Sequence, residues 1–138
     1  MLNSLPNDLR GSQPPGMDRS PSSAETVRFG DASITVRRRQ DGDACFLVQQ
    51  GAETVARSCL RHLGPTEIGY AATSSAVGGV AGDEVHAVIV RVMRRGTIWA
   101  QLAHGAFYAQ LPPGRPARAV VKVLRDASRH SFAVARPR

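Results

Sequence analysis

The sequence predicts a mainly β fold: a small antiparallel β-sandwich or barrel with an extended N-terminal arm and at most one or two short helices. Three observations support this. Short runs of alternating apolar and polar residues begin at residue 26. Turn-forming Gly, Pro and Asp recur about every eight to twelve residues, as in all-β domains. Hydrophobic residues make up 42% and charged residues 21% of the 138 residues, as in ordinary globular proteins.

Residues 1–25 differ in composition from the rest of the chain. Four prolines lie among serines, glycines and charged residues, and apolar side chains are few. Such a segment buries too little surface to offset the entropy of ordering it, so we expect a polar arm that lies across another subunit. The remainder, 26–138, is expected to form a single β-rich domain with a basic C-terminal segment.

The first part of the domain predicts strands at 26–29, 33–39 and 44–50. Gly30-Asp31 separates the first two, and Asp41-Gly42 is typical of a tight hairpin turn. Residues 52–63 fit two structures. The spacing of Val55, Cys59 and Leu60 suits one face of a short helix, which we favour, but a strand remains the alternative.

The second part begins with an expected strand at 67–72 and a glycine-rich loop at 73–82. Residues 84–94 form the strongest strand pattern, and because both of its faces are apolar it should lie in the interior of a sheet. Further strands are expected at 97–103, 106–111, 117–124 and 131–135, separated by glycines and prolines. Trp99, Phe107 and Tyr108 are expected to pack in the core rather than to stack on nucleic-acid bases.

The formal net charge is +7, and Lys122 is the only lysine among eighteen cations. The C-terminal segment concentrates this charge, with Asp126 as its one acidic residue. Such a segment favours an acidic protein surface or nucleic acid, and the simpler alternative is a solvated basic face. The candidate partner-binding residues are Arg115, Arg118, Lys122, Arg125, Arg129, Arg136 and Arg138.

The two cysteines are too few for a four-thiolate zinc site, and their apolar neighbours predict buried free thiols. A papain-like cysteine hydrolase is one enzymatic alternative, with Cys45 as nucleophile, His86 as base, Gln101 orienting the imidazole and Gln40 donating to the oxyanion. The local context disfavours it, because such a cysteine should begin a helix, and Cys45 enters a strand.

The four histidines are isolated and lack metal-ligand spacing. The close acidic pairs Asp41/Asp43 and Asp83/Glu84 fall at expected turns, where Asp caps the backbone. We therefore predict no catalytic residue, no metal site and no cofactor. No apolar run approaches the ~18 residues of a membrane span, and the N-terminus lacks the apolar core of a secretory signal.

Residues 77–85 (VGGVAGDEV), followed by 96–103 (GTIWAQLA), resemble a phrase found in phage capsid decoration, or cement, proteins. The resemblance implies a non-enzymatic virion protein that clamps capsid subunits, commonly as a homo-oligomer. Its expected location is the virion, or the cytoplasm before assembly. No membrane partner is implied.

A second pattern is similar to forkhead-associated phosphothreonine-binding domains. It comprises Ile68-Gly69, Ser74-Ser75, His86-Ala87, Trp99 and His104-Gly105. Two phosphate-contacting positions depart from that family: Tyr70 replaces the expected arginine, and Asp83 or Glu84 replaces the expected serine. The likeness therefore implies a degenerate protein-interaction module without phosphate binding.

Overall fold

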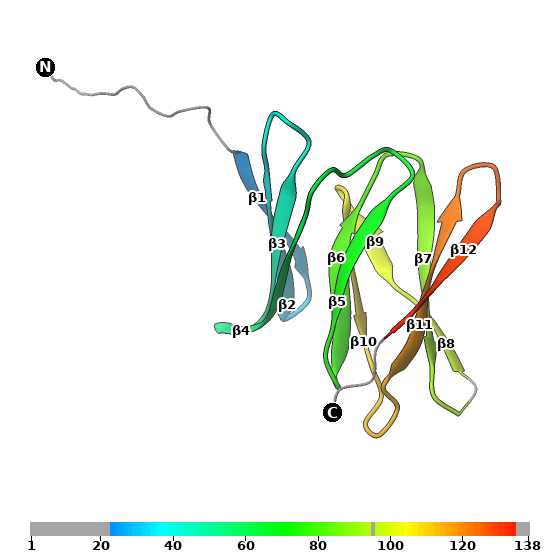
Figure 1. Cartoon of the computed structure of the whole chain (residues 1–138). Coiled ribbons are helices and arrows are strands. Elements are labelled where there is room, and N and C mark those ends of the chain that lie inside the picture. The colour runs from blue at the N-terminus through cyan, green and yellow to red at the C-terminus, as the bar shows by residue number, and fades with distance from the viewer. Residues whose placement is uncertain (1–22, 95, 135–138) are drawn as a thin grey trace, which may run out of the picture.

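The computed structural model describes residues 23–94 and 96–134, and there the chain is built from antiparallel strands, as predicted (Figure 1). The described part contains no helix, so it has none long and apolar enough to cross a membrane. The strands are β1 Ser23–Phe29, β2 Ala32–Arg38, β3 Ala44–Gln50, β4 Glu53–Leu60, β5 Ile68–Ala72, β6 Ala76–Ala81, β7 Val85–Val92, β8 Gly96–Trp99, β9 Gln101–Ala103, β10 Ala106–Gln110, β11 Ala117–Leu124 and β12 Arg129–Ala133.

The strands form three four-stranded sheets, which we call A, B and C. Their strand orders are β1-β2-β3-β4, β5-β6-β10-β9 and β12-β11-β7-β8. Sheet B lies between the other two (Figure 1). One apolar cluster fills the space between A and B, and a second fills the space between B and C. The predicted sandwich is therefore present with a third layer added, and the described strands form three open sheets rather than a barrel.

Sheet A is a meander of consecutive strands. Ile34 and Val36 of β2 point toward sheet B, as their alternation predicts. The turn at Asp41-Gly42 also forms, with Gly42 at φ +94°. The expected arm ends inside this sheet, because residues 23–25 begin β1; residues 1–22 lie outside the described residues.

The predicted helix at 52–63 is wrong, because residues 53–60 form β4 along the edge of sheet A. Its spacing of apolar residues suits a helix, but β4 pairs with β3 over seven positions, including Cys45 opposite Cys59. Tertiary pairing outweighs a weak local helical pattern.

The predicted loop at 73–82 is also wrong, because Ala76–Ala81 forms β6, fully buried inside sheet B. Glycine is required at two positions of β6 because neighbouring atoms of sheets A and B approach the backbone closely. A Cβ on Gly78 would lie 2.9 Å from a methyl of Val48, and a Cβ on Gly79 would meet the Gly69 carbonyl and lie 2.9 Å from the Phe107 ring.

The predicted strand at 97–103 is divided between two sheets. β8 belongs to sheet C and β9 to sheet B, and the chain crosses from one to the other at Ala100, whose N–H donates to the Val88 carbonyl at 2.9 Å. β7 lies between β11 and β8, which confirms the prediction that it is an interior strand.

The core uses two of the three aromatic residues predicted for it. Phe107 and Tyr108 are neighbours on β10, so their side chains enter opposite faces of sheet B, and both are buried. Tyr108 packs against Phe29 with ring centroids 6.1 Å apart, and its hydroxyl accepts a hydrogen bond from Gln50 Nε2 at 2.8 Å.

Candidate functional site

The residues of the cysteine-hydrolase hypothesis do not meet. Cys45 lies on β3 in sheet A and His86 on β7 in sheet C, with sheet B between these layers. Gln101 begins β9 and Gln40 lies in the β2–β3 turn. Cys45 is moreover bonded to Cys59, so the expected free thiol is absent. The arrangement provides no nucleophile–base pair from these residues.

Both cysteines are exposed and form a disulfide, so the prediction of buried free thiols is wrong. The residues around them suit a core position, but the strand parity places them outward. Phe46 and Val48 of β3 point into the core, and their neighbour Cys45 therefore points to the opposite face. The alternation of apolar residues in 44–50 therefore indicates that Cys45 points outward.

Of the acidic residues expected to cap turns, Asp41 does so, and Asp126 caps a further turn. Asp41 Oδ1 accepts the Asp43 N–H at 3.0 Å. Asp126 Oδ1 accepts the Ser128 hydroxyl at 2.6 Å and the Ser128 N–H at 2.9 Å. These hydrogen bonds, the hydroxyl bond foremost, lower the pKa of Asp126. Within residues 23–94 and 96–134, no group of three or more His, Cys, Asp or Glu could hold a metal ion.

The candidate basic residues do not share one surface. Lys122 Nζ donates to the Thr66 carbonyl at 2.6 Å and lies 5.6 Å from the centroid of the Phe132 ring. Arg125 Nε donates to the Asp83 carbonyl at 3.2 Å. These two cations thus tie sheet C to neighbouring loops. Arg129 is exposed on β12, and Arg115 and Arg118 lie toward the start of β11; Arg136 and Arg138 lie outside the described residues.

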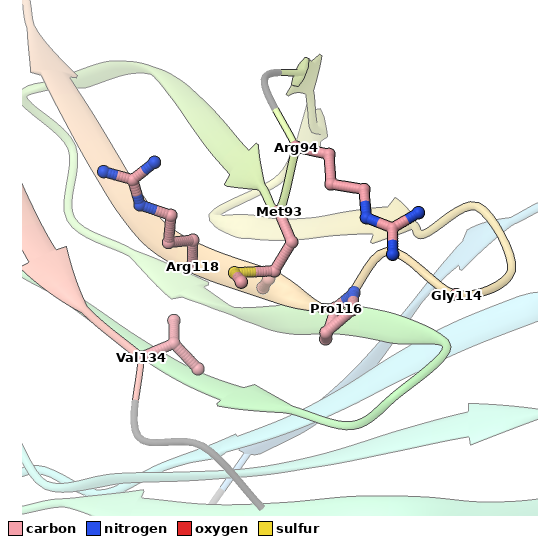
Figure 2. Close-up of a pocket in the computed structure, with 7 residues that line it drawn as sticks. Met93, Arg94, Gly114, Pro116, Arg118 and Val134 are labelled. Atoms are coloured by element: carbon pink, nitrogen blue, oxygen red, sulfur yellow. The ribbon is translucent and has the colours of Figure 1, made fainter.

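Arg118 borders a cavity of about 580 Å³ beside the β7–β8 turn (Figure 2). Met93 lies between the Arg94 and Arg118 side chains, and the lining residues include no acidic group. Hydrogen bonds from Met93 N–H to the Pro116 carbonyl and from Val134 N–H to the Arg118 carbonyl hold the walls together. The cavity therefore combines positive charge with an apolar floor.

A small apolar cluster lies on the face of sheet C that points away from sheet B; Ile89, Val121 and Val123 are themselves buried there, and Trp99 is largely exposed. Its members form a cluster separate from the two interlayer cores. In register, Trp99 of β8 pairs with Ile89 of β7, which pairs with Val121 of β11. We call this cluster the outer patch: Ala87, Ile89, Trp99, Val121 and Val123.

The prediction that Trp99 packs in the core is wrong, because 61% of its surface is exposed. Ile98 takes the inward position on β8, so the strand's alternation sends Trp99 to the outer face. The prediction of a single strand at 97–103 does not reveal the outward position of Trp99, because the segment is divided between two sheets. An exposed tryptophan is a candidate interface residue, because aromatic side chains are enriched in the cores of protein interfaces.

No protein-family model, curated protein or solved structure matches this chain.

Proposed function

We propose that this protein is a non-enzymatic assembly module that binds a protein partner through the outer patch of sheet C. The observation that carries the proposal is the exposed side chain of Trp99, which pairs in register with the buried Ile89 on a sheet face that no described layer covers. Interface cores are enriched in aromatic residues, and tryptophan is among the residues that most often dominate binding energy.

The charges around the outer patch select the chemistry of the partner. Arg91 on β7 and Arg129 on β12 are both exposed, and strand parity places both on the outer face. Complementary charge speeds association and fixes its orientation. A second copy would bring one arginine-bordered patch against another. We therefore propose a different protein, with an apolar recess for the Trp99 indole and Asp or Glu side chains around it.

A capsid decoration role is the specific form of this proposal that the sequence resemblance supports. In that role the partner is a capsid subunit, the polar segment 1–25 adds contacts, and the protein works in the virion. A stable interface buries about 1,600 Å² in total, and an arm of this length can supply a large fraction of that area. Deleting residues 1–22, which precede β1, should then weaken particle binding and leave the domain folded.

The proposal is tested by placing a photo-crosslinking amino acid at position 99 of the full chain and expressing this variant in the cells in which the protein naturally occurs. The matched control carries the same group at position 57, which is exposed on sheet A. We expect a covalent product with one other protein from position 99 only. Arg91→Glu with Arg129→Glu should reduce that product at least tenfold.

Three results would reject the proposal. These are no product from position 99, equal products from both positions, or a product that contains only this chain. The Trp99→Ala variant separates binding from stability. Because Trp99 is exposed, this substitution should change the free energy of unfolding by about 1 kcal/mol or less.

A further inference from the structure

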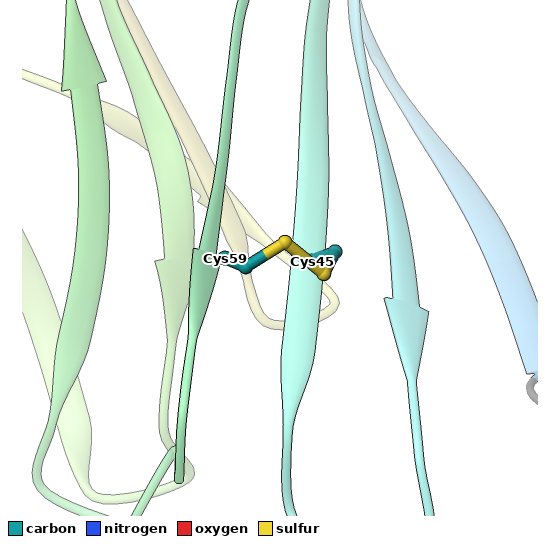
Figure 3. Close-up of a disulfide and its surroundings, with 2 residues drawn as sticks. All are labelled: Cys45 and Cys59. Atoms are coloured by element: carbon teal, nitrogen blue, oxygen red, sulfur yellow. A yellow bond between two sulfur atoms is a disulfide. The ribbon is translucent and has the colours of Figure 1, made fainter.

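The only two cysteines of the chain form an exposed disulfide on the face of sheet A that points away from the core (Figure 3). Cys45 and Cys59 are direct partners on β3 and β4, and β4 is an edge strand. No described layer covers this face, so a small molecule can reach the sulfur atoms from solvent.

The surroundings of the disulfide are positively charged. Arg37 on β2 lies opposite Cys45 in the register, and Arg57 lies two residues before Cys59 on β4, which places it on the same face. Both arginines are exposed, and both line the same cavity of about 410 Å³ as the two cysteines. Thr35 and Leu47 complete its outward wall, and no acidic residue lines it.

We propose that Cys45–Cys59 is a thiol–disulfide exchange site selective for small thiols that carry carboxylates, of which glutathione is the test case. A disulfide of purely structural use needs neither exposure nor a cationic cavity. Here the sulfur atoms, the two guanidinium groups and an open cavity occur together, and this combination matches an anionic thiol.

The exchange balances with two molecules of the thiol. The thiolate of the first attacks Sγ of one cysteine, forming a mixed disulfide as the Cys45–Cys59 bond breaks and the other cysteine leaves as a thiolate. The second thiolate attacks the mixed disulfide at the small-molecule sulfur. The products are the free dithiol of the protein and the oxidised disulfide of the small thiol, so each small thiol gives one electron.

Arg37 and Arg57 act on two charges in this reaction. They stabilise the negative charge that the three sulfur atoms share during attack. This charge develops with every attacking thiol. They also attract the carboxylates that only some thiols carry. One unit charge about 6 Å away in water changes a rate about threefold, so removing both guanidinium groups should slow glutathione about tenfold.

The experiment compares three thiols on the full oxidised protein: glutathione, neutral 2-mercaptoethanol and cationic cysteamine, at equal thiolate concentration. Released protein thiols are trapped with iodoacetamide and counted by mass spectrometry; every labelled thiol comes from this bond. The variants are Arg37→Gln with Arg57→Gln, and the control Arg28→Gln, which alters an exposed arginine on β1 of the same sheet. The ratio of wild-type to variant rate cancels the intrinsic reactivity of each thiol.

We expect that ratio to be near ten for glutathione, smaller for 2-mercaptoethanol and smallest for cysteamine, with the control near one for all three. The differences should shrink in 1 M salt, since exposed charges are screened there. Equal ratios for the three thiols would overturn the proposed selectivity. Reduction no faster than global unfolding, measured separately, would show that the bond is closed to exchange in the folded protein. Matching thermal midpoints would confirm that the variants fold.

Discussion

Two neighbouring glycines of β6 offer a direct test of the three-layer arrangement. A Cβ on Gly78 would meet side chains of sheet A, whereas a Cβ on Gly79 would meet the Gly69 backbone and the Phe107 ring within sheet B, so the two positions probe different contacts of the middle layer. We predict that Gly78→Ala is mildly destabilising and that Gly79→Ala is severely so, although the two changes are chemically identical.

The difference follows from what each new Cβ would meet. At Gly78 the neighbours are the ends of side chains, Val48 at 2.9 Å and Ile34 at 3.1 Å, which can shift. At Gly79 the neighbour is the backbone carbonyl of Gly69 on the adjacent strand, which cannot move without disturbing the β5–β6 pairing.

Overpacking costs about 1–3 kcal/mol and occasionally more. Replacing glycine returns about 0.4–1 kcal/mol by restricting the unfolded chain where no strain results. The net loss should therefore be about 0.5–1.5 kcal/mol for Gly78→Ala and about 2–3 kcal/mol or more for Gly79→Ala. With about 4 °C per kcal/mol for a domain of this size, Gly79→Ala should lower the Tm by about 10 °C.

Urea unfolding followed by circular dichroism measures both values, and thermal unfolding provides a second estimate. If Gly79→Ala unfolds at the wild-type midpoint, the Gly69 carbonyl and the Phe107 ring do not approach Gly79 closely in the folded protein. Equal losses for the two variants would refute the distinction between a side-chain neighbour and a backbone neighbour.

Three further outcomes are expected. Phe107→Ala removes a fully buried ring and should cost about 3–5 kcal/mol, measured by urea unfolding. Replacing both Cys45 and Cys59 by Ser opens a loop with a sequence separation of 14 and should cost up to about 3 kcal/mol, by the same assay. In the folded protein the Asp126 carboxyl should have a pKa below its ordinary value of 3.8, as measured by NMR. The Ser128→Ala substitution should raise the pKa of Asp126 toward 3.8. Because the folded pKa is the lower one, the stabilisation from Asp126 is present above about pH 4 and is lost as the pH falls through the folded pKa. An unshifted Asp126 in the wild-type protein would contradict the hydrogen bonds from Ser128.

The strands that are bounded by clear turn-forming residues could be predicted from the sequence. Residues 44–50 and 117–124 have the expected bounds because a turn signal precedes each and their β-branched or aromatic residues alternate. The interior position of β7 was also evident, since a strand with two apolar faces must be covered on both.

The remaining features depend on contacts between distant parts of the chain. β6 resembles a loop in sequence because glycine and alanine have low strand propensity, and their use is explained by the close approach of sheet A at Gly78 and of the neighbouring strands of sheet B at Gly79. The position of Trp99 depends on the chain crossing between sheets at Ala100, which no local pattern records. The Cys45–Cys59 bond depends on β4 pairing with β3, which places Cys59 directly opposite Cys45, and their apolar neighbours in sequence do not indicate this pairing.

The connectivity of the three sheets has a kinetic consequence. Sheet A is assembled from consecutive hairpins, whereas sheets B and C pair strands far apart in sequence, such as β6 with β10 and β7 with β11. Local contacts form faster than distant ones. The β1–β4 meander should therefore arise early during refolding, with its apolar side bare until the slower middle layer closes over it. During that interval the partly folded chain is most prone to aggregation.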